Sequence, residues 1–158
     1  MDFLEAMALE LEVVNEIVVA TMNLIEEKQD ELLNTEQVRI EIKKGCSPEH
    51  HEVIDLLLHA SHDSTKHTHS FGRAEQGTGC SHPMGCKSVK LSGKEESVLL
   101  KFKLQKLLEM FSFEEEHLLP AICGGLKESG NIMWWCALHN RQKSDSLAWY
   151  LASRGSGI

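Results

Sequence analysis

The spacing of apolar residues in the first part of the chain most constrains how it can fold. Between residues 2 and 33 they recur at intervals of three and four: Leu4, Met7, Leu11, Val14, Val18, Ile25 and Leu32. Such spacing places them on one face of a long helix. Acidic side chains fill the opposite face. The segment predicts a single helix over residues 2–33 that packs within a bundle, or alternatively pairs with its own copy in a dimer.

Further helices are predicted downstream by their start signals and periodicity. Ser47-Pro48-Glu49 is typical of a helix start, and Ser92 followed by Glu95 is the pattern of a capping box. Short helices are expected across residues 95–153, with an interruption at Pro120. We therefore expect a mainly α protein, a bundle of four to five helices forming one domain over residues 1–158.

Two short segments predict at most one small two-stranded element. In residues 37–43 apolar and charged side chains alternate, which favours a half-buried strand. Its expected partner is the run 87–91, which carries Val89 and Leu91. A helix that continues through to Gly45 fits the same residues.

Histidines and cysteines gather in one stretch, from Cys46 to Cys86. It holds seven of the nine histidines and three of the five cysteines. Within it, residues 66–90 are rich in glycine, serine and threonine and predict a long loop inserted between helices. Loops of this length inside a domain are uncommon unless something holds them. Since imidazole and thiolate are good ligands for transition metals, a metal ion is the expected restraint.

The predicted metal ligands lie at the two ends of this loop. Cys80, His82 and Cys86 fall within seven residues, in a turn that contains glycine and proline. Tetrahedral zinc needs a fourth ligand, for which His67 or His69 is placed at the other end, and Cys46 is an alternative. A loop with no metal and incidental histidines and cysteines is the competing interpretation. Cys123 and Cys136, which have apolar neighbours, are predicted to be buried, inert thiols.

Overall charge and segment lengths restrict the classes of partner and compartment. The net charge of −8 argues against a nucleic-acid-binding surface. No apolar run reaches the roughly 20 residues that cross a bilayer, and the acidic N-terminal region does not resemble a secretory signal. We expect a cytoplasmic or nuclear protein that is not secreted and has no membrane partner. In that setting disulfides are not expected.

Enzymatic chemistry finds weaker support in the sequence. His51, Asp55 and His59 are spaced by four and would share a helix face, which could hold a catalytic metal with help from Glu114 and His117. Cys136 and His139 are three residues apart, but no oxyanion turn or orienting side chain accompanies them. The sequence therefore favours a protein that is not an enzyme.

Two stretches resemble the capsid (core) proteins of hepadnavirus-type viruses. Cys46-Ser-Pro-Glu-His-His51 is similar to the segment that opens the first spike helix of that family. Ile132-Met-Trp-Trp135, with Tyr150-Leu151 and Ser153, is similar to the end of the descending spike helix and the helix after it. The resemblance implies an all-helical dimer that assembles into a shell.

These observations lead to three hypotheses of function. The first is a non-enzymatic interaction or regulatory module with a zinc-clasped loop, which acts on a protein partner or through self-association as a homo-oligomer. The second is a self-assembling viral capsid protein. The third is a metalloenzyme that uses the helix face of His51, Asp55 and His59.

Overall fold

The fold is known from a computed structural model, which describes residues 2–28, 31, 33–61, 71–75, 77–117, 119, 121–127 and 131–143. In these residues the α-helices are α1 (Phe3–Lys28), α2 (Thr35–Lys44), α3 (His51–Leu57), α4 (Gly93–Phe102), α5 (Gln105–Phe111) and α6 (Ala137–Lys143). Short 3-10 turns are η1 (Pro48–His50) and η2 (Ala121–Cys123), and the strands are β1 (Phe113–His117) and β2 (Ile132–Cys136). The mainly helical class with one small sheet is confirmed, and the described part has more helices than expected. The helix predicted near residues 144–153 lies outside the described residues.

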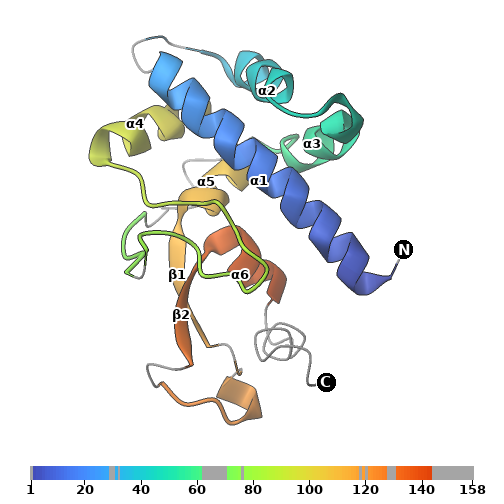
Figure 1. The fold of residues 1–158 in the computed structure, drawn as a ribbon. Helices are drawn as coiled ribbons and strands as arrows, with labels where there is room; N and C mark the ends of the chain where they lie inside the picture. Colours follow the sequence, from blue (N-terminus) through green and yellow to red (C-terminus); the bar gives the residue numbers. More distant parts are fainter. Residues whose placement is uncertain are drawn as a thin grey trace.

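Helix α1 forms the centre around which the other helices are arranged. It ends at Lys28 rather than at residue 33, so the predicted length was too great. Its inner face is fully apolar except for Thr21, whose hydroxyl donates to the carbonyl of Ile17 at 2.7 Å, so no donor is stranded there. α2, α3 and α4 pack against it, and Figure 1 shows α1 crossing the molecule diagonally between α2 and α4.

The segment predicted as a strand, residues 37–43, is helical. Asn34 caps α2: its side chain accepts from the Gln37 amide at 2.9 Å, and the Gln37 side chain accepts from the Asn34 amide in return. Val38 and Ile42, four residues apart, are buried, whereas Ile40 is 44% exposed. Val38 and Ile42 fit both the alternation of a strand and the spacing of a helix, so the apolar pattern alone does not distinguish the two. The Asn34 cap favours the helix.

The sheet is formed by other residues than those predicted. β1 and β2 pair antiparallel, with Phe113 opposite Cys136 and His117 opposite Ile132. Both segments were expected to be helical, and that expectation was wrong. The sheet has aromatic and β-branched side chains that favour strands, but its register depends on a pairing partner that the local pattern does not reveal.

Ion pairs tie α6 to the sheet and to α5. The buried Lys143 side chain donates to Glu116 Oε1 at 2.8 Å and to the carbonyl of His117 at 2.9 Å. Arg141 bonds Glu109, on α5, and Glu114, on β1. Burial of charge is tolerated here because each buried charge has an opposite partner.

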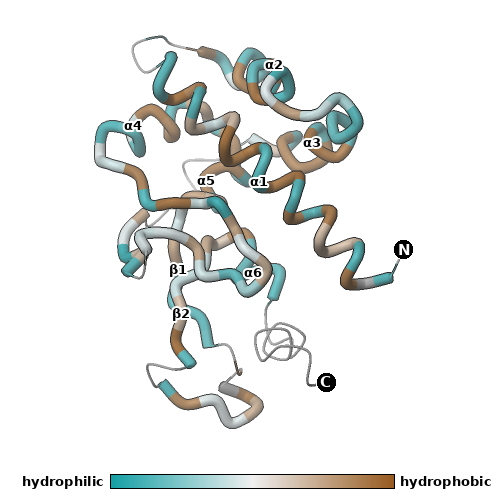
Figure 2. Tube along the Cα trace, in the orientation of Figure 1, coloured by the Kyte–Doolittle hydropathy of each residue, from teal (hydrophilic) through white to brown (hydrophobic). Residues whose placement is uncertain are grey.

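Most buried apolar side chains of the described helices and sheet form one core, and Trp135 lies in a small second cluster with Met7, Cys80 and Met133. Buried side chains from α1 through α6 form a contiguous cluster, and Figure 2 shows apolar residues recurring between hydrophilic ones along α1. Among the described residues, no helix is both long enough and apolar enough to span a bilayer. The loop 77–91 and the start of α6 lie at the edge of this core.

Candidate metal centre

The loop from residue 77 to 91 folds back on itself and presents two cysteines. The Cys80 amide donates to the Ser88 carbonyl at 2.9 Å, and the Lys90 amide donates to the Thr78 carbonyl at 2.6 Å. At the tip the Gly85 amide donates to the His82 carbonyl at 2.9 Å. Gly85 has a φ of +88°, a conformation that side-chain-bearing residues rarely adopt. This closed tip brings the thiols of Cys80 and Cys86 to the same side.

Hydrogen bonds to β2, α5 and α1 hold the loop against the rest of the protein. The Ser81 amide donates to the Trp134 carbonyl of β2 at 2.8 Å. The Ser88 hydroxyl donates to the Met110 carbonyl of α5. The Asn15 side chain of α1 makes two hydrogen bonds to the tip. It donates to the Gly85 carbonyl at 3.2 Å and accepts from the Lys87 amide at 2.8 Å. The loop is therefore built into the body of the protein.

The junction of β2 and α6 supplies the other two side chains. Cys136 ends the strand and His139 lies in the first turn of the helix, so both point to the same side of the junction. The Ala137 amide donates to the Ser112 carbonyl at 2.7 Å and fixes the change of direction. His139 Nδ1 lies 3.3 Å from Cys136 Sγ.

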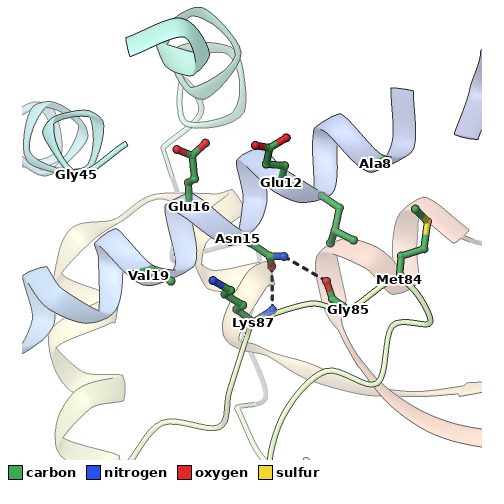
Figure 3. A pocket seen from close by; sticks show the side chains of 10 residues that line it. Ala8, Glu12, Asn15, Glu16, Val19, Gly45, Met84, Gly85 and Lys87 are labelled. Carbon is green, nitrogen blue, oxygen red and sulfur yellow. Dashed lines mark hydrogen bonds between the residues drawn. The ribbon is translucent and has the colours of Figure 1, made fainter. Parts of the chain in front are cut away.

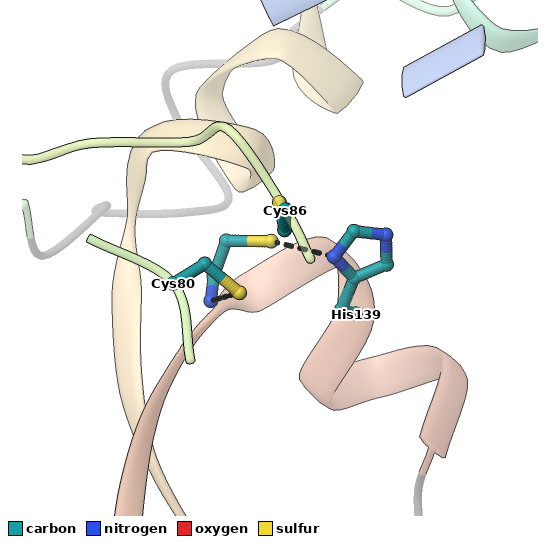
Figure 4. A group of neighbouring side chains, drawn as sticks. Cys80, Cys86 and His139 are labelled. Atoms are coloured by element: carbon teal, nitrogen blue, oxygen red, sulfur yellow. Dashed lines mark hydrogen bonds between the residues drawn. The ribbon is translucent and has the colours of Figure 1, made fainter. Parts of the chain in front are cut away.

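The two pairs meet in a cluster of four possible ligands. Its members are Cys80, Cys86, Cys136 and His139. Their ligand atoms all lie within 4.8 Å of one another. Figure 4 shows the cysteines of the loop and the histidine of α6 converging on one point. A tetrahedral ion with metal–sulfur bonds of about 2.3 Å sets neighbouring sulfurs about 3.8 Å apart, so the cluster matches the size of a metal centre.

Burial and hydrogen bonding suit charged sulfur at this place. Cys136 and His139 are buried, and the two loop cysteines are half-buried. The backbone amide of Cys136 donates to Cys80 Sγ at 3.2 Å. An amide donor stabilises a thiolate more than a thiol, because hydrogen bonds to ionised acceptors are stronger.

The three thiols cannot all ionise easily without a cation. Hydrogen bonds from Cys136 and Cys86 hold the pKa of Cys80 far below its usual range despite burial. The pKa of Cys86 rises to about 12: a hydrogen bond involving Cys136 opposes the rise, but the hydrogen bond with Cys80 and burial outweigh it. The hydrogen bonds of Cys136 with the other two thiols, together with burial, raise its pKa well above the usual thiol value. One negative charge is thus favourable on the sulfurs, and a bound dication would supply the attraction that further ionisation needs.

His82, a predicted ligand, lies beside the cluster and not in it. Its Nδ1 accepts from the Met84 amide at 3.1 Å, and its ring centroid is 4.5 Å from that of His139 and 5.0 Å from that of Trp135. Burial and the neighbouring His139 lower the pKa of His82 to about 4, against the opposing effect of Cys80. The neutral ring of His82 therefore packs against the ring of His139, at the edge of the cluster.

The remaining predicted ligands divide into two groups. His67 and His69 lie outside the described residues. Cys46 is buried under α1, where burial and Glu16 raise its thiol pKa to about 11, and it does not belong to the cluster. Cys123 was predicted to be buried, but the structure exposes it, because it lies in the short turn η2 outside the core.

The helix face proposed for a catalytic metal is dispersed. His51 bonds the Cys46 carbonyl at 3.3 Å, and Asp55 pairs with Lys43 at 3.0 Å. His59 follows the end of α3 and bonds the Leu56 carbonyl at 2.6 Å. Glu114 is engaged by Asn140 and Arg141 on the sheet side. Among the described residues, the group whose ligand atoms lie close enough to hold one metal ion is the cluster of Cys80, Cys86, Cys136 and His139, and it includes none of these side chains.

Cys136 and His139 were available in the sequence as ligands but were interpreted differently. Their Cys-x-x-His spacing is a common half of a zinc site. The sequence alone favoured a buried, inert thiol for Cys136, and it gave little support to a Cys136–His139 nucleophile because no oxyanion turn or orienting side chain accompanies the pair. The spacing could have been matched with Cys80 and Cys86 as the second half of a four-ligand site.

Comparison with known proteins gives no family and no relative from which a function could be inferred. The resemblance to hepadnavirus-type core proteins stays a hypothesis. No protein-family model, no curated protein and no solved structure matches the chain.

Proposed function

We propose that this protein is a non-enzymatic interaction module whose loop is clasped by one zinc ion. Four side chains would hold the ion: Cys80, Cys86, Cys136 and His139. The observation that carries the proposal is the convergence of four buried or half-buried ligand atoms within 4.8 Å, from two segments distant in sequence. Three thiolates and one imidazole form a ligand set typical of structural zinc.

The ligand count supports a structural and not a catalytic role. Catalytic zinc keeps one position open for water or substrate, whereas four protein ligands fill a tetrahedral shell. The ion would join the loop to the β2–α6 junction. Its effect would be to hold the shape of the surface that the loop presents, which is what a module acting through protein contacts requires.

Metal analysis of the purified protein tests the proposal. About one equivalent of zinc is expected in the wild type, and less than half an equivalent in Cys136→Ser and in His139→Asn. Cys123→Ser is the matched control, since its thiol is exposed and remote from the cluster, and it should keep the zinc. Each variant should be checked by circular dichroism so that loss of metal is not confused with loss of fold.

The same measurement separates the two possible ligand sets. Replacement of both His67 and His69 by alanine should leave the zinc content unchanged if His139 is the fourth ligand. A wild-type protein without zinc, or a His139→Asn variant that retains a full equivalent, would contradict the proposal.

A further inference from the structure

A groove runs along the outer face of α1, and the clasped loop forms one of its walls. It encloses about 480 Å³ between α1, the turn at Gly45 and the loop tip from Met84 to Lys87. Figure 3 shows the Asn15 side chain bonded to the loop tip within this groove. The wall is therefore fixed to α1 on one side and, through Cys86, to the cluster on the other.

The lining of the groove is apolar at the base and acidic at the edge. Ala8, Leu11 and Val19 contribute from α1, and Met84 contributes from the loop. Val19 is 41% exposed and Met84 is 39% exposed, so apolar surface is open to an incoming side chain. Methionine adapts its shape to different partners, which suits a binding wall.

A second hollow continues the same side of α1 toward its C-terminal end. It encloses about 210 Å³ between Met22, Asn23 and Glu26 of α1 and residues Lys94 and Val98 of α4. From Ala8 to Glu26 the two hollows span about 27 Å, at 1.5 Å per helical residue. That length fits a helix of about five turns lying beside α1.

Charge selects the kind of partner. The side chains that line the two hollows include four glutamates and two lysines: Glu12, Glu16, Glu26 and Glu95, with Lys87 and Lys94. Glu16 is already bonded to Ser47 and His50, but Glu12 is exposed at the groove. A second copy of α1 in the groove would bring glutamates against glutamates, whereas a basic segment would meet opposite charge.

We propose that this groove binds a basic amphipathic helix of a protein partner. Its apolar face would lie on Val19 and Met84, and its lysines or arginines would face the glutamates of α1. The proposal rests on the proposed function in one respect, because the zinc-clasped loop would set the position of the Met84 wall.

Fluorescence anisotropy with a labelled model peptide tests the groove. The probe is an 18-residue peptide of leucine and lysine with leucines at helical spacing, titrated with the full-length protein in 0.15 M salt. Val19→Lys should weaken binding at least tenfold, since it removes apolar contact and adds like charge. Leu56→Lys is the matched control: it replaces an exposed apolar side chain, 68% exposed on α3 and outside the groove, and should change affinity less than twofold.

Two further peptides separate groove binding from general attraction to an acidic protein. A peptide of the same composition with its leucines scattered around the helix should bind at least tenfold more weakly, and a leucine–glutamate analogue should not bind. Equal affinity for the scattered peptide, equal effects of Val19→Lys and Leu56→Lys, or no saturable binding would overturn the proposal. Ala8→Lys, at another exposed groove position, repeats the test if Val19→Lys does not fold.

The result can be read separately from that of the metal. If the purified protein contains no zinc but binds the peptide with sensitivity to Val19→Lys, the zinc proposal is rejected and the groove proposal stands. If the protein contains zinc but binds the peptide without that sensitivity, the groove proposal is rejected and the zinc proposal stands.

Discussion

Glu16 and His50 form an ion pair that fastens the end of η1 to the middle of α1. Glu16 Oε1 also accepts from the Ser47 amide at 2.9 Å and from its hydroxyl at 2.6 Å. The hydrogen bond with Glu16 raises the pKa of His50 above its ordinary value, against a smaller effect of burial. Burial raises the pKa of Glu16, but hydrogen bonds from Ser47 and His50 outweigh this and lower it.

These shifts predict a pH window for the pair. A raised histidine pKa adds stability that is complete below about pH 6.5 and is lost as pH rises through the folded value. A lowered glutamate pKa adds stability that is present above about pH 4.3 and is lost as pH falls through the folded value. His50→Gln should therefore reduce the free energy of unfolding more at pH 5.5 than at pH 8.5 in urea titrations. An equal loss at both pH values for His50→Gln would refute the prediction.

Single residues also show how far the site could be predicted. Cys80 and Cys86 were identified from their spacing in a glycine-containing turn, and they do lie in the cluster. The other two members come from a strand–helix junction 56 positions beyond Cys80. Local spacing cannot reveal which distant segment folds against a loop, so the second half of the site needed the three-dimensional structure.

At the scale of elements, α2 and the sheet show why periodicity alone misled. Val38, Ile40 and Ile42 fit a strand, but Asn34 with Gln37 is a capping box that starts a helix. That signal is present in the sequence, one residue beyond the predicted end of the first helix at residue 33. For β1 and β2 the difficulty was different: their stability depends on each other, across an intervening segment, and neither has a clear alternation.

The contact between α1 and the end of α2 gives a prediction on elements. A Cβ atom on Gly45 would lie 2.9 Å from the Cβ atom of Ala20, whereas one on Gly93, at the start of α4, would meet nothing within 4 Å. Gly45→Ala should destabilise the protein by about 1–3 kcal/mol, because the turn after α2 must move away from α1. Gly93→Ala should be neutral or stabilising by up to about 1 kcal/mol, since alanine favours the helix.

Urea unfolding of both variants measures these changes under the same conditions. A Gly45→Ala variant as stable as Gly93→Ala would show that α1 and α2 do not approach as closely as described.

At the scale of the whole molecule, metal removal should separate two parts of the protein. α1 and α2 bury apolar side chains in the core without using the cluster, while the loop and α6 are joined by it. Chelation should therefore speed hydrogen exchange in residues 77–90 and 132–143 and leave most of the helical circular dichroism. Acidification below about pH 6 should act in the same direction, because protons compete with metal for thiolate and imidazole.

Hydrogen exchange followed by mass spectrometry, with and without a chelator, makes the comparison. Cys123→Ser should respond as the wild type does, and Cys136→Ser should resemble the chelated protein from the outset. Unchanged protection of residues 77–90 on chelation would show that hydrogen bonds alone hold the loop, and loss of protection in α1 would show that the helices depend on the metal.

The separation of the two ligand pairs along the chain has a consequence for the unfolded state. The cluster joins points 56 residues apart, so an ion held by both pairs would close a long loop that contains α4, α5 and β1. A cross-link of that span lowers the conformational entropy of an unfolded chain by an amount worth about 4 kcal/mol at 25 °C, by analogy with a disulfide. The benefit would be reversible, because the cross-link forms and opens with the supply of metal and needs no oxidation of the cysteines.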